Sequence, residues 1–249
     1  MRALTTPEML EVWERGLAES PLQRSLMLIS AAAAEPIEAT ARLSAGRRDA
    51  RLLTLREWAF GPHLAAVASC PRCGERLELS FRASDVRVEA EPEPAEMARV
   101  EVAGYELRCR APNSLDLIAI AGHRDRAAAR RQLLERCLSE ITRERAPVTP
   151  VTPVTVDQLP DEVIDAAVER IAQADPQADV RIALSCPQCG HQWQVLFDIG
   201  PFFWSEIHVW AQRILRETHT LASAYGWREM DILMMSPWRR QFYLNCISG

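Results

Sequence analysis

The sequence predicts an α+β protein, mostly helical, in which helices pack around two short β-hairpins that share one metal site. Three features predict this class. A Cys-x-x-Cys stretch occurs twice, apolar residues alternate with a period of two after each copy, and apolar residues recur at helical spacing through most of the remaining chain.

The repeat comprises residues 66–81 (AVASCPRCGERLELSF) and 182–197 (IALSCPQCGHQWQVLF), and both copies contain Ser-Cys-Pro-x-Cys-Gly. Two cysteines separated by two residues form a tight knuckle, and the glycine supplies the positive φ that the turn needs. Each knuckle supplies half a site, so Cys70, Cys73, Cys186 and Cys189 make the closed thiolate set that Zn²⁺ takes in structural sites.

Alternating apolar residues after each knuckle predict a half-buried strand. They are Leu77, Leu79 and Phe81 in the first copy, and Trp193, Val195 and Phe197 in the second. We therefore expect two hairpins, each with a knuckle at its tip, that face one another across one metal as a split zinc ribbon.

Other interpretations of the cysteines remain open. A thioredoxin-like dithiol belongs at the start of a helix, whereas here a β pattern follows both pairs. Iron also suits four thiolates, although Zn²⁺ is our first expectation. His191 could replace a cysteine as ligand, but Glu75 holds the matching place in the first copy, which favours a solvent-facing histidine.

Composition limits the compartment and the class of partner. The chain has 249 residues, 48% of them hydrophobic, without a signal-peptide pattern or an apolar stretch long enough to span a bilayer, so we expect no membrane role and a cytoplasmic location. Seven cysteines argue against a disulfide framework, and Cys109, Cys137 and Cys246 are expected to be buried.

The formal net charge is −5 and every basic residue is arginine, which excludes Schiff-base and P-loop lysine chemistry. An acidic chain also makes nucleic-acid binding an unfavoured alternative.

The amino-terminal region, residues 1–65, is predicted to be helical. Thr5-Thr6-Pro7-Glu8 and Ser20-Pro21 are helix-start signals, and the apolar spacing over 48–64 predicts a further helix that leads into the first knuckle hairpin, residues 66–82.

The inserted region, residues 83–179, begins with an acidic linker at 89–96 and a hairpin centred on Ala103-Gly104. Asn113 or Ser114 caps a helix, and a longer helix is predicted over 125–142. Prolines 147, 150 and 153 form a stiff connector, and Asp161 starts another helix.

The second knuckle hairpin, residues 180–199, precedes a helical tail at 200–249 that is rich in aromatic and methionine residues. The sequence contains no G-x-S-x-G, no H-E-x-x-H and no glycine-rich phosphate loop, so we expect no enzyme.

The tail resembles the end of the T4-type baseplate hub assembly chaperones and related small proteins encoded with phage tails and contractile injection systems. The resemblance rests on 217–219 (ETH), 222–227 (ASAYGW), 232–233 (IL), 236–240 (SPWRR) and 243–244 (YL). The order LCRAPNSLDLIAIA, LLERC and CPQCGHQW resembles the zinc-knuckle members of that set.

The resemblance implies a non-enzymatic assembly factor, or a minor component of a contractile tail baseplate, that binds hub or other baseplate proteins. It brings no catalytic residues. It implies partner contact for residues in the tail motif: Tyr225, Trp227, Trp238, Arg239 and Arg240. A zinc-ribbon protein that binds nucleic acid or acts as a regulator is the alternative.

Overall fold

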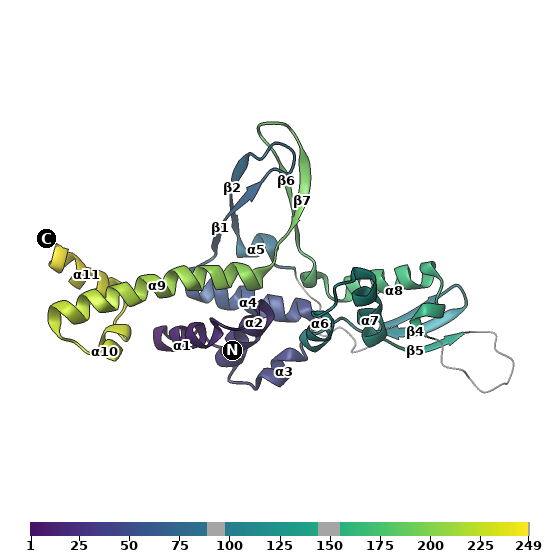
Figure 1. The fold of residues 1–249 in the computed structure, drawn as a ribbon, viewed down its shortest axis with the longest axis horizontal. Helices are drawn as coiled ribbons and strands as arrows, with labels where there is room; N and C mark the ends of the chain where they lie inside the picture. The colour runs from purple at the N-terminus through teal and green to yellow at the C-terminus, as the bar shows by residue number, and fades with distance from the viewer. Residues whose placement is uncertain (89–97, 144–154, 249) are drawn as a thin grey trace. The chain divides into compact units, whose positions relative to one another are not determined.

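The computed structural model describes residues 1–88, 98–143 and 155–248, which form two compact units (Figure 1). The first unit comprises Met1–Ile37, Leu52–Gly61 and Asp198–Gly249, and the second comprises Glu38–Arg51 and Pro62–Phe197. The fold is α+β and mostly helical, with small antiparallel sheets, as predicted. In these ranges, no helix has both the length and the apolar character required to cross a bilayer.

Helices build the first unit. They are α1 (Thr6–Gly16), α2 (Pro21–Ala33), the second part of α4 (Ala45–Phe60), α9 (Ile199–Tyr225), α10 (Glu229–Leu233) and α11 (Pro237–Ser248). The predicted starts of α1 and α2 are confirmed: Thr5 and Glu8 form a capping box, and the Ser20 hydroxyl accepts a hydrogen bond from the Gln23 N–H at 3.2 Å.

The core of the first unit lies between α1, α2, α4 and α9. Its largest fully buried side chains are Leu26, Leu28, Ile29, Leu52, Leu53, Ile199, Phe203, Ile207, Ile214 and Leu221. Helix α1 approaches α9 closely because Gly16 has no side chain, and a Cβ there would overlap the ring of Trp204. The indole N–H of Trp13 also donates to His208 Nδ1 at 3.1 Å, which links the same two helices.

The second unit contains all of the β-structure in the described ranges. Its hairpins are β1–β2 (His63–Ser69, Arg76–Arg82) and β6–β7 (Arg181–Ser185, Gln192–Leu196), and its three-stranded sheet is β3–β4–β5 (Ala98–Val102, Tyr105–Cys109, Leu138–Arg143). Its helices, apart from the first part of α4, are α3 (Ile37–Ala41), α5 (Ala83–Val86), α6 (Ser114–Ile120), α7 (Arg126–Cys137), α8 (Asp161–Ala174) and the single turns η1 (Val156–Gln158) and η2 (Pro176–Ala178).

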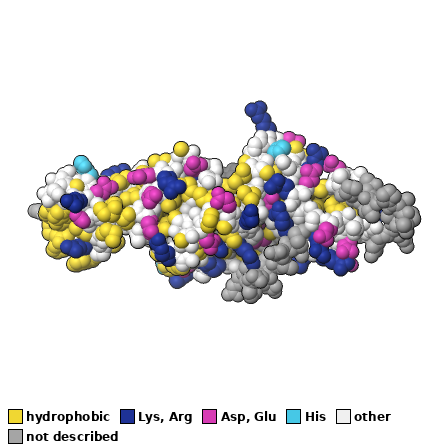
Figure 2. All heavy atoms as spheres, turned by 90° about the horizontal axis from the view of Figure 1, so that it is seen from below, with side chains coloured by type: hydrophobic (Ala, Val, Ile, Leu, Met, Phe, Trp, Pro, Cys, Tyr) yellow, Lys and Arg dark blue, Asp and Glu magenta, His cyan; other side chains and the backbone are white. Residues whose placement is uncertain are grey.

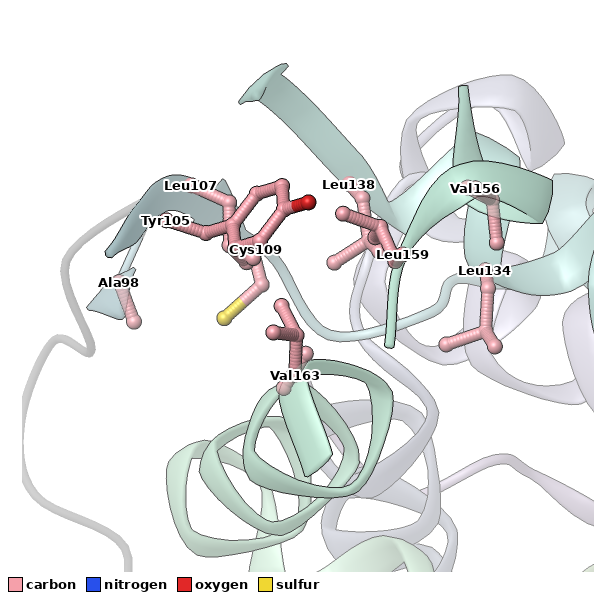
Figure 3. Close-up of a cluster of buried hydrophobic side chains, with 10 residues drawn as sticks. Ala98, Tyr105, Leu107, Cys109, Leu134, Leu138, Val156, Leu159 and Val163 are labelled. Atoms are coloured by element: carbon pink, nitrogen blue, oxygen red, sulfur yellow. The ribbon is translucent and has the colours of Figure 1, made fainter. Parts of the chain in front are cut away.

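The core of the second unit lies between the three-stranded sheet and α8 (Figure 3). Leu107 on β4 and Val163 on α8 are both 0% exposed. The predicted hairpin around residues 103 and 104 is confirmed, because β3 pairs with β4 across a two-residue turn in which Ala103 and Gly104 have φ values of 53° and 75°. Two positive φ values in a two-residue loop match the right-handed twist of the strands.

Two predicted helix ends are wrong. The helix expected over 125–142 stops at Cys137, and Leu138–Arg143 forms β5 against β4 instead. The apolar residues at the end of this stretch suit either state, and the open edge of β4 decides in favour of a strand. The helix expected over 48–64 runs from Ala45 to Phe60, because Gly61 at φ 85° and the following proline end it before β1.

The isolated cysteines differ in exposure. Cys109 and Cys137 are buried as predicted, and burial raises the pKa of both thiols, that of Cys137 to about 11. Cys246 on α11 is exposed, so the expectation of burial is wrong there.

The predicted acidic linker and the predicted proline-rich connector lie outside the described residues. The division of the sequence into residues 1–65, 66–82, 83–179, 180–199 and 200–249 stays a prediction. The packing of helices around the hairpins also stays a prediction.

Candidate metal centre

The two repeated stretches form the two predicted hairpins. In the first, β1 pairs with β2 from His63↔Arg82 to Ser69↔Arg76, and in the second, β6 pairs with β7 from Arg181↔Leu196 to Ser185↔Gln192. Each Cys-x-x-Cys pair therefore lies in the turn that joins its two strands. The hairpins stand next to one another in Figure 1.

The two turns share one pattern of backbone hydrogen bonds. In the first, the Gly74 N–H donates to the carbonyl of Cys70 at 2.9 Å, and in the second the Gly190 N–H donates to the carbonyl of Cys186 at 2.9 Å. Both glycines have positive φ, at 78° and 69°. The sequence repeat thus corresponds to a structural repeat, and glycine holds a conformation that other residues rarely adopt.

The four sulfur atoms lie together although the pairs are far apart in sequence. Cys70 Sγ is 3.7 Å from Cys189 Sγ, Cys73 Sγ is 3.6 Å from Cys186 Sγ, and all four lie within 4.8 Å of one another. Zn–S bonds of about 2.3 Å in a tetrahedron place sulfurs about 3.8 Å apart, whereas a disulfide requires about 2.05 Å. The spacing therefore fits a tetrahedral metal site and does not fit disulfides.

The same residues shape the ionisation of the thiols. Burial raises the pKa of Cys70, but the backbone N–H groups of Cys73 and Arg72 outweigh it and lower that pKa to about 7. For Cys73, the N–H of Glu75 lowers the pKa, whereas burial and the neighbouring thiols raise it to about 12. A bound cation would favour the ionised form of these thiols, because a metal ion binds the thiolate and not the thiol.

His191 does not join this group. Its ring stacks on Trp193 with centroids 5.8 Å apart and an interplanar angle of 10°. In the described part of the chain, the His, Cys, Asp and Glu ligand atoms that gather in this way are those of the four cysteines alone. The candidate site is therefore a four-sulfur site.

The hairpins face one another through a small apolar contact. Phe81 and Phe197 meet edge to face with centroids 5.6 Å apart, next to a hollow of about 280 Å³ between the hairpins. Exposed and half-buried residues alternate along β2 and β7, and Leu196 keeps 61% of its surface exposed. An isolated two-stranded hairpin is marginally stable. A cross-link between the two hairpins would therefore add to the small stabilisation that this apolar contact provides.

Comparison with known proteins connects this arrangement to a family. Residues 25–204 match the family described as T4 bacteriophage base plate protein, a range that includes both cysteine pairs and the region between them. The chain belongs to this base plate protein family. No curated protein and no solved structure gives a significant match.

A buried carboxylate that sequence reasoning missed lies inside the matched range. Asp116 accepts bonds from Arg110 at 2.6 and 3.0 Å and from Arg136 at 2.8 Å, and it forms a capping box with Asn113. Burial raises the pKa of Asp116, but these donors outweigh burial, so the pKa lies below its ordinary value. The Asn-x-x-Asp spacing predicts the cap, whereas the two arginines become neighbours only through the fold.

A second buried carboxylate positions the start of α4. Asp175 accepts hydrogen bonds from the Gly46 N–H at 2.7 Å and from the Ser44 hydroxyl at 2.9 Å. This carboxylate therefore sits at the positive end of the helix, where it binds one N–H of the first turn and the hydroxyl of the residue before the helix. In this member of the base plate protein family, Asp116 joins parts of the region between the hairpins, and Asp175 joins that region to the start of α4.

The carboxy-terminal motif lies beyond the matched range. Tyr225 and Trp227 stack with centroids 4.4 Å apart, and Trp238 and Arg239 are exposed, the former at 77%. Arg240 is 3% exposed and donates to Glu217 at 3.3 Å and to the Met235 carbonyl at 2.7 Å. Arg240 thus joins α11 to α9, and partner contact by the other tail residues stays a prediction.

Proposed function

We propose that this chain acts, without catalysing a reaction, as a chaperone-like assembly factor or a minor structural component of a contractile, phage-tail-like baseplate. The observation that carries the proposal is the match to the base plate protein family over residues 25–204. The resemblance of the tail to the hub assembly chaperones supports the assembly role, with hub or other baseplate proteins as partners in the cytoplasm.

Within this function, the four cysteines hold one structural Zn²⁺ and the two hairpins act as a split zinc ribbon. Sulfur separations of 3.6 and 3.7 Å support a tetrahedral ion, and four protein ligands leave no open position for a substrate or a water. A bound zinc would supply a cross-link between two distant parts of the chain and no chemistry on a substrate. Iron is the second choice, because it also suits four thiolates.

The absence of catalysis is part of the proposal. The charged groups that are most strongly engaged serve internal contacts: Asp116 binds two arginines, and Glu206 binds the buried Arg56 at 2.6 Å. Such contacts hold elements of the fold together, which is a structural role for these carboxylates.

An exposed apolar surface supports contact with a protein partner. Hydrophobic side chains gather over the carboxy-terminal helices at the left of Figure 2. The carboxy-terminal surface consists of Met230, Met234, Trp238 and Phe242, which are 57, 68, 77 and 52% exposed. Aromatic and methionine side chains are enriched at the centres of protein interfaces, and methionine adapts its shape to different partners.

The test combines complementation with capture. In cells that carry the tail gene cluster, loss of this gene is expected to stop assembly of tails, as counted by electron microscopy, and the wild-type gene restores it. The double variant Trp238→Ala/Phe242→Ala is expected not to restore assembly and to lose capture of co-expressed baseplate proteins.

The matched control is Ile118→Ala, which removes an apolar side chain that is 49% exposed on α6. Mass spectrometry of purified tails separates the two roles, because a chaperone leaves the finished particle and a component stays. Normal tails in cells without the gene would refute the proposal.

A further inference from the structure

A second feature of the first unit is a hollow of about 470 Å³ between α4 and α9, within the size range of ligand-binding pockets. Two side chains of α4, Arg56 and Phe60, line one wall. The other wall is a stripe along α9: Ser205, Glu206, Val209, Trp210 and Arg213. Both walls are therefore built from helical side chains, and most of the surface that faces the hollow is apolar.

Hydrogen bonds and an aromatic contact hold the two walls in place. Arg56 is 3% exposed and donates to both carboxylate oxygens of Glu206, at 2.6 and 2.8 Å, and to the Gly61 carbonyl at 2.7 Å. Phe60 packs edge to face against Phe203 of α9 with centroids 5.9 Å apart. The hollow is thus preformed, which lowers the entropic cost of binding.

The surface that lines the hollow includes apolar side chains that are open to solvent. Val209 keeps 69% of its surface exposed, and Trp210 beside it is only partly buried. Residues 206, 210 and 213 recur at helical spacing of three and four, as do 205 and 209. Such a groove between two helices is the shape that receives the apolar face of an amphipathic helix.

The charged side chains at the hollow favour a partner that carries a negative charge. Glu206 is neutralised by Arg56 within the wall. At the other end, the Arg213 side chain is 65% exposed, and its contact with Glu217 is 3.6 Å long. Glu217 already accepts from the buried Arg240 at 3.3 Å, so Arg213 presents a guanidinium to solvent at the rim.

We propose that this hollow binds an amphipathic helix of a partner protein that places apolar side chains on Val209 and Trp210 and a carboxylate on Arg213. The chemistry of this site does not depend on the baseplate role. The hollow is distinct from the carboxy-terminal surface.

The probe is a displayed library of helical peptides that carry a fixed leucine stripe at i, i+3, i+4 and i+7. Each flanking position is randomised among Glu, Gln and Lys, and the library is selected on the purified full-length protein. We expect Glu to be enriched about tenfold over Lys at a position next to the leucine stripe, because a glutamate carboxylate there can pair with the Arg213 guanidinium. Anisotropy with a selected peptide then gives its affinity for each variant.

Arg213→Glu is expected to weaken the selected peptide about tenfold, and Val209→Asp to abolish binding, since it places a charge in the apolar hollow. Arg216→Glu is the matched control, because Arg216 is an exposed arginine on the same helix that does not line the hollow. Circular dichroism checks that each variant is folded, and both Arg213 and Val209 are exposed enough for that to be expected.

Equal enrichment of Glu and Lys, or equal effects of Arg213→Glu and Arg216→Glu, would overturn the proposal. Binding that survives Val209→Asp would do the same. Failure of the baseplate assembly test leaves the peptide result standing, so the two proposals fail separately.

Discussion

Replacement of one cluster cysteine is expected to cost a large share of the stability of the second unit. Cys73 and Cys186 are 113 residues apart, so a metal that binds both closes a long loop. The loop-closure relation for cross-links gives about 5 kcal/mol for a loop of this length. Because domains are stable by only about 5–15 kcal/mol, a bound metal would supply a decisive contribution to the free energy of unfolding.

The perturbation is Cys186→Ser, and the matched control is Cys246→Ser, which changes an exposed cysteine outside the cluster. Elemental analysis of purified protein is expected to find one zinc per chain in the parent and in the control, and less in Cys186→Ser. Thermal unfolding followed by circular dichroism should then show a midpoint lower by about 10–20 °C. Removal of metal from the parent with a chelator should reproduce that shift.

Full retention of metal in Cys186→Ser, or a melting midpoint equal to that of Cys246→Ser, would refute the reasoning. The first outcome removes the four-sulfur site, and the second shows that the hairpins are stable without the cross-link.

Three further changes test contacts within the units. Asp116→Asn is expected to lower the free energy of unfolding by roughly 2 kcal/mol at neutral pH, as measured by urea unfolding. In the folded wild type, the pKa of Asp116 lies below its unfolded value of about 4. The stability advantage of the wild type is therefore full above that unfolded value and disappears as the pH falls through the folded pKa. Arg240→Met should destabilise the first unit by roughly 2–4 kcal/mol, and the addition of Glu217→Gln should recover part of the loss, a coupling that a double-mutant cycle measures. Leu107→Ala, at a fully buried position, should cost roughly 2–5 kcal/mol in the same assay, and a loss below 1 kcal/mol would contradict the assignment of this core.

Local signals in the sequence predicted a large part of the structure. Thr5 and Glu8 specify a helix start through hydrogen bonds within four residues, and the spacing of each cysteine pair with its glycine specifies a knuckle. The similarity of the two stretches also predicted that the pairs share one site, which the sulfur distances support. The helix start and the knuckles depend on neighbours in the chain, so motif spacing is sufficient to find them, whereas the shared site was found from the repeat.

Features that depend on distant neighbours and have no repeated motif in the sequence were not predicted. The stretch that became β5 has apolar residues compatible with a helix, and it is a strand because β4 offers an edge. Arg240 belongs to a surface-like motif in the sequence, yet it is buried because Glu217 lies across from it on α9. Likewise, the hollow beside Val209 exists only once α4 and α9 are packed together.

The distance between the cysteine pairs also has a consequence for synthesis on the ribosome. Translation at roughly 5–20 residues per second takes about 6–23 s to cover the 113 residues between Cys73 and Cys186. During that interval the first pair has no partner pair, and its thiols are open to oxidation or to a competing metal. We expect the nascent chain to depend on the reducing power and zinc supply of its surroundings far more than the finished protein does.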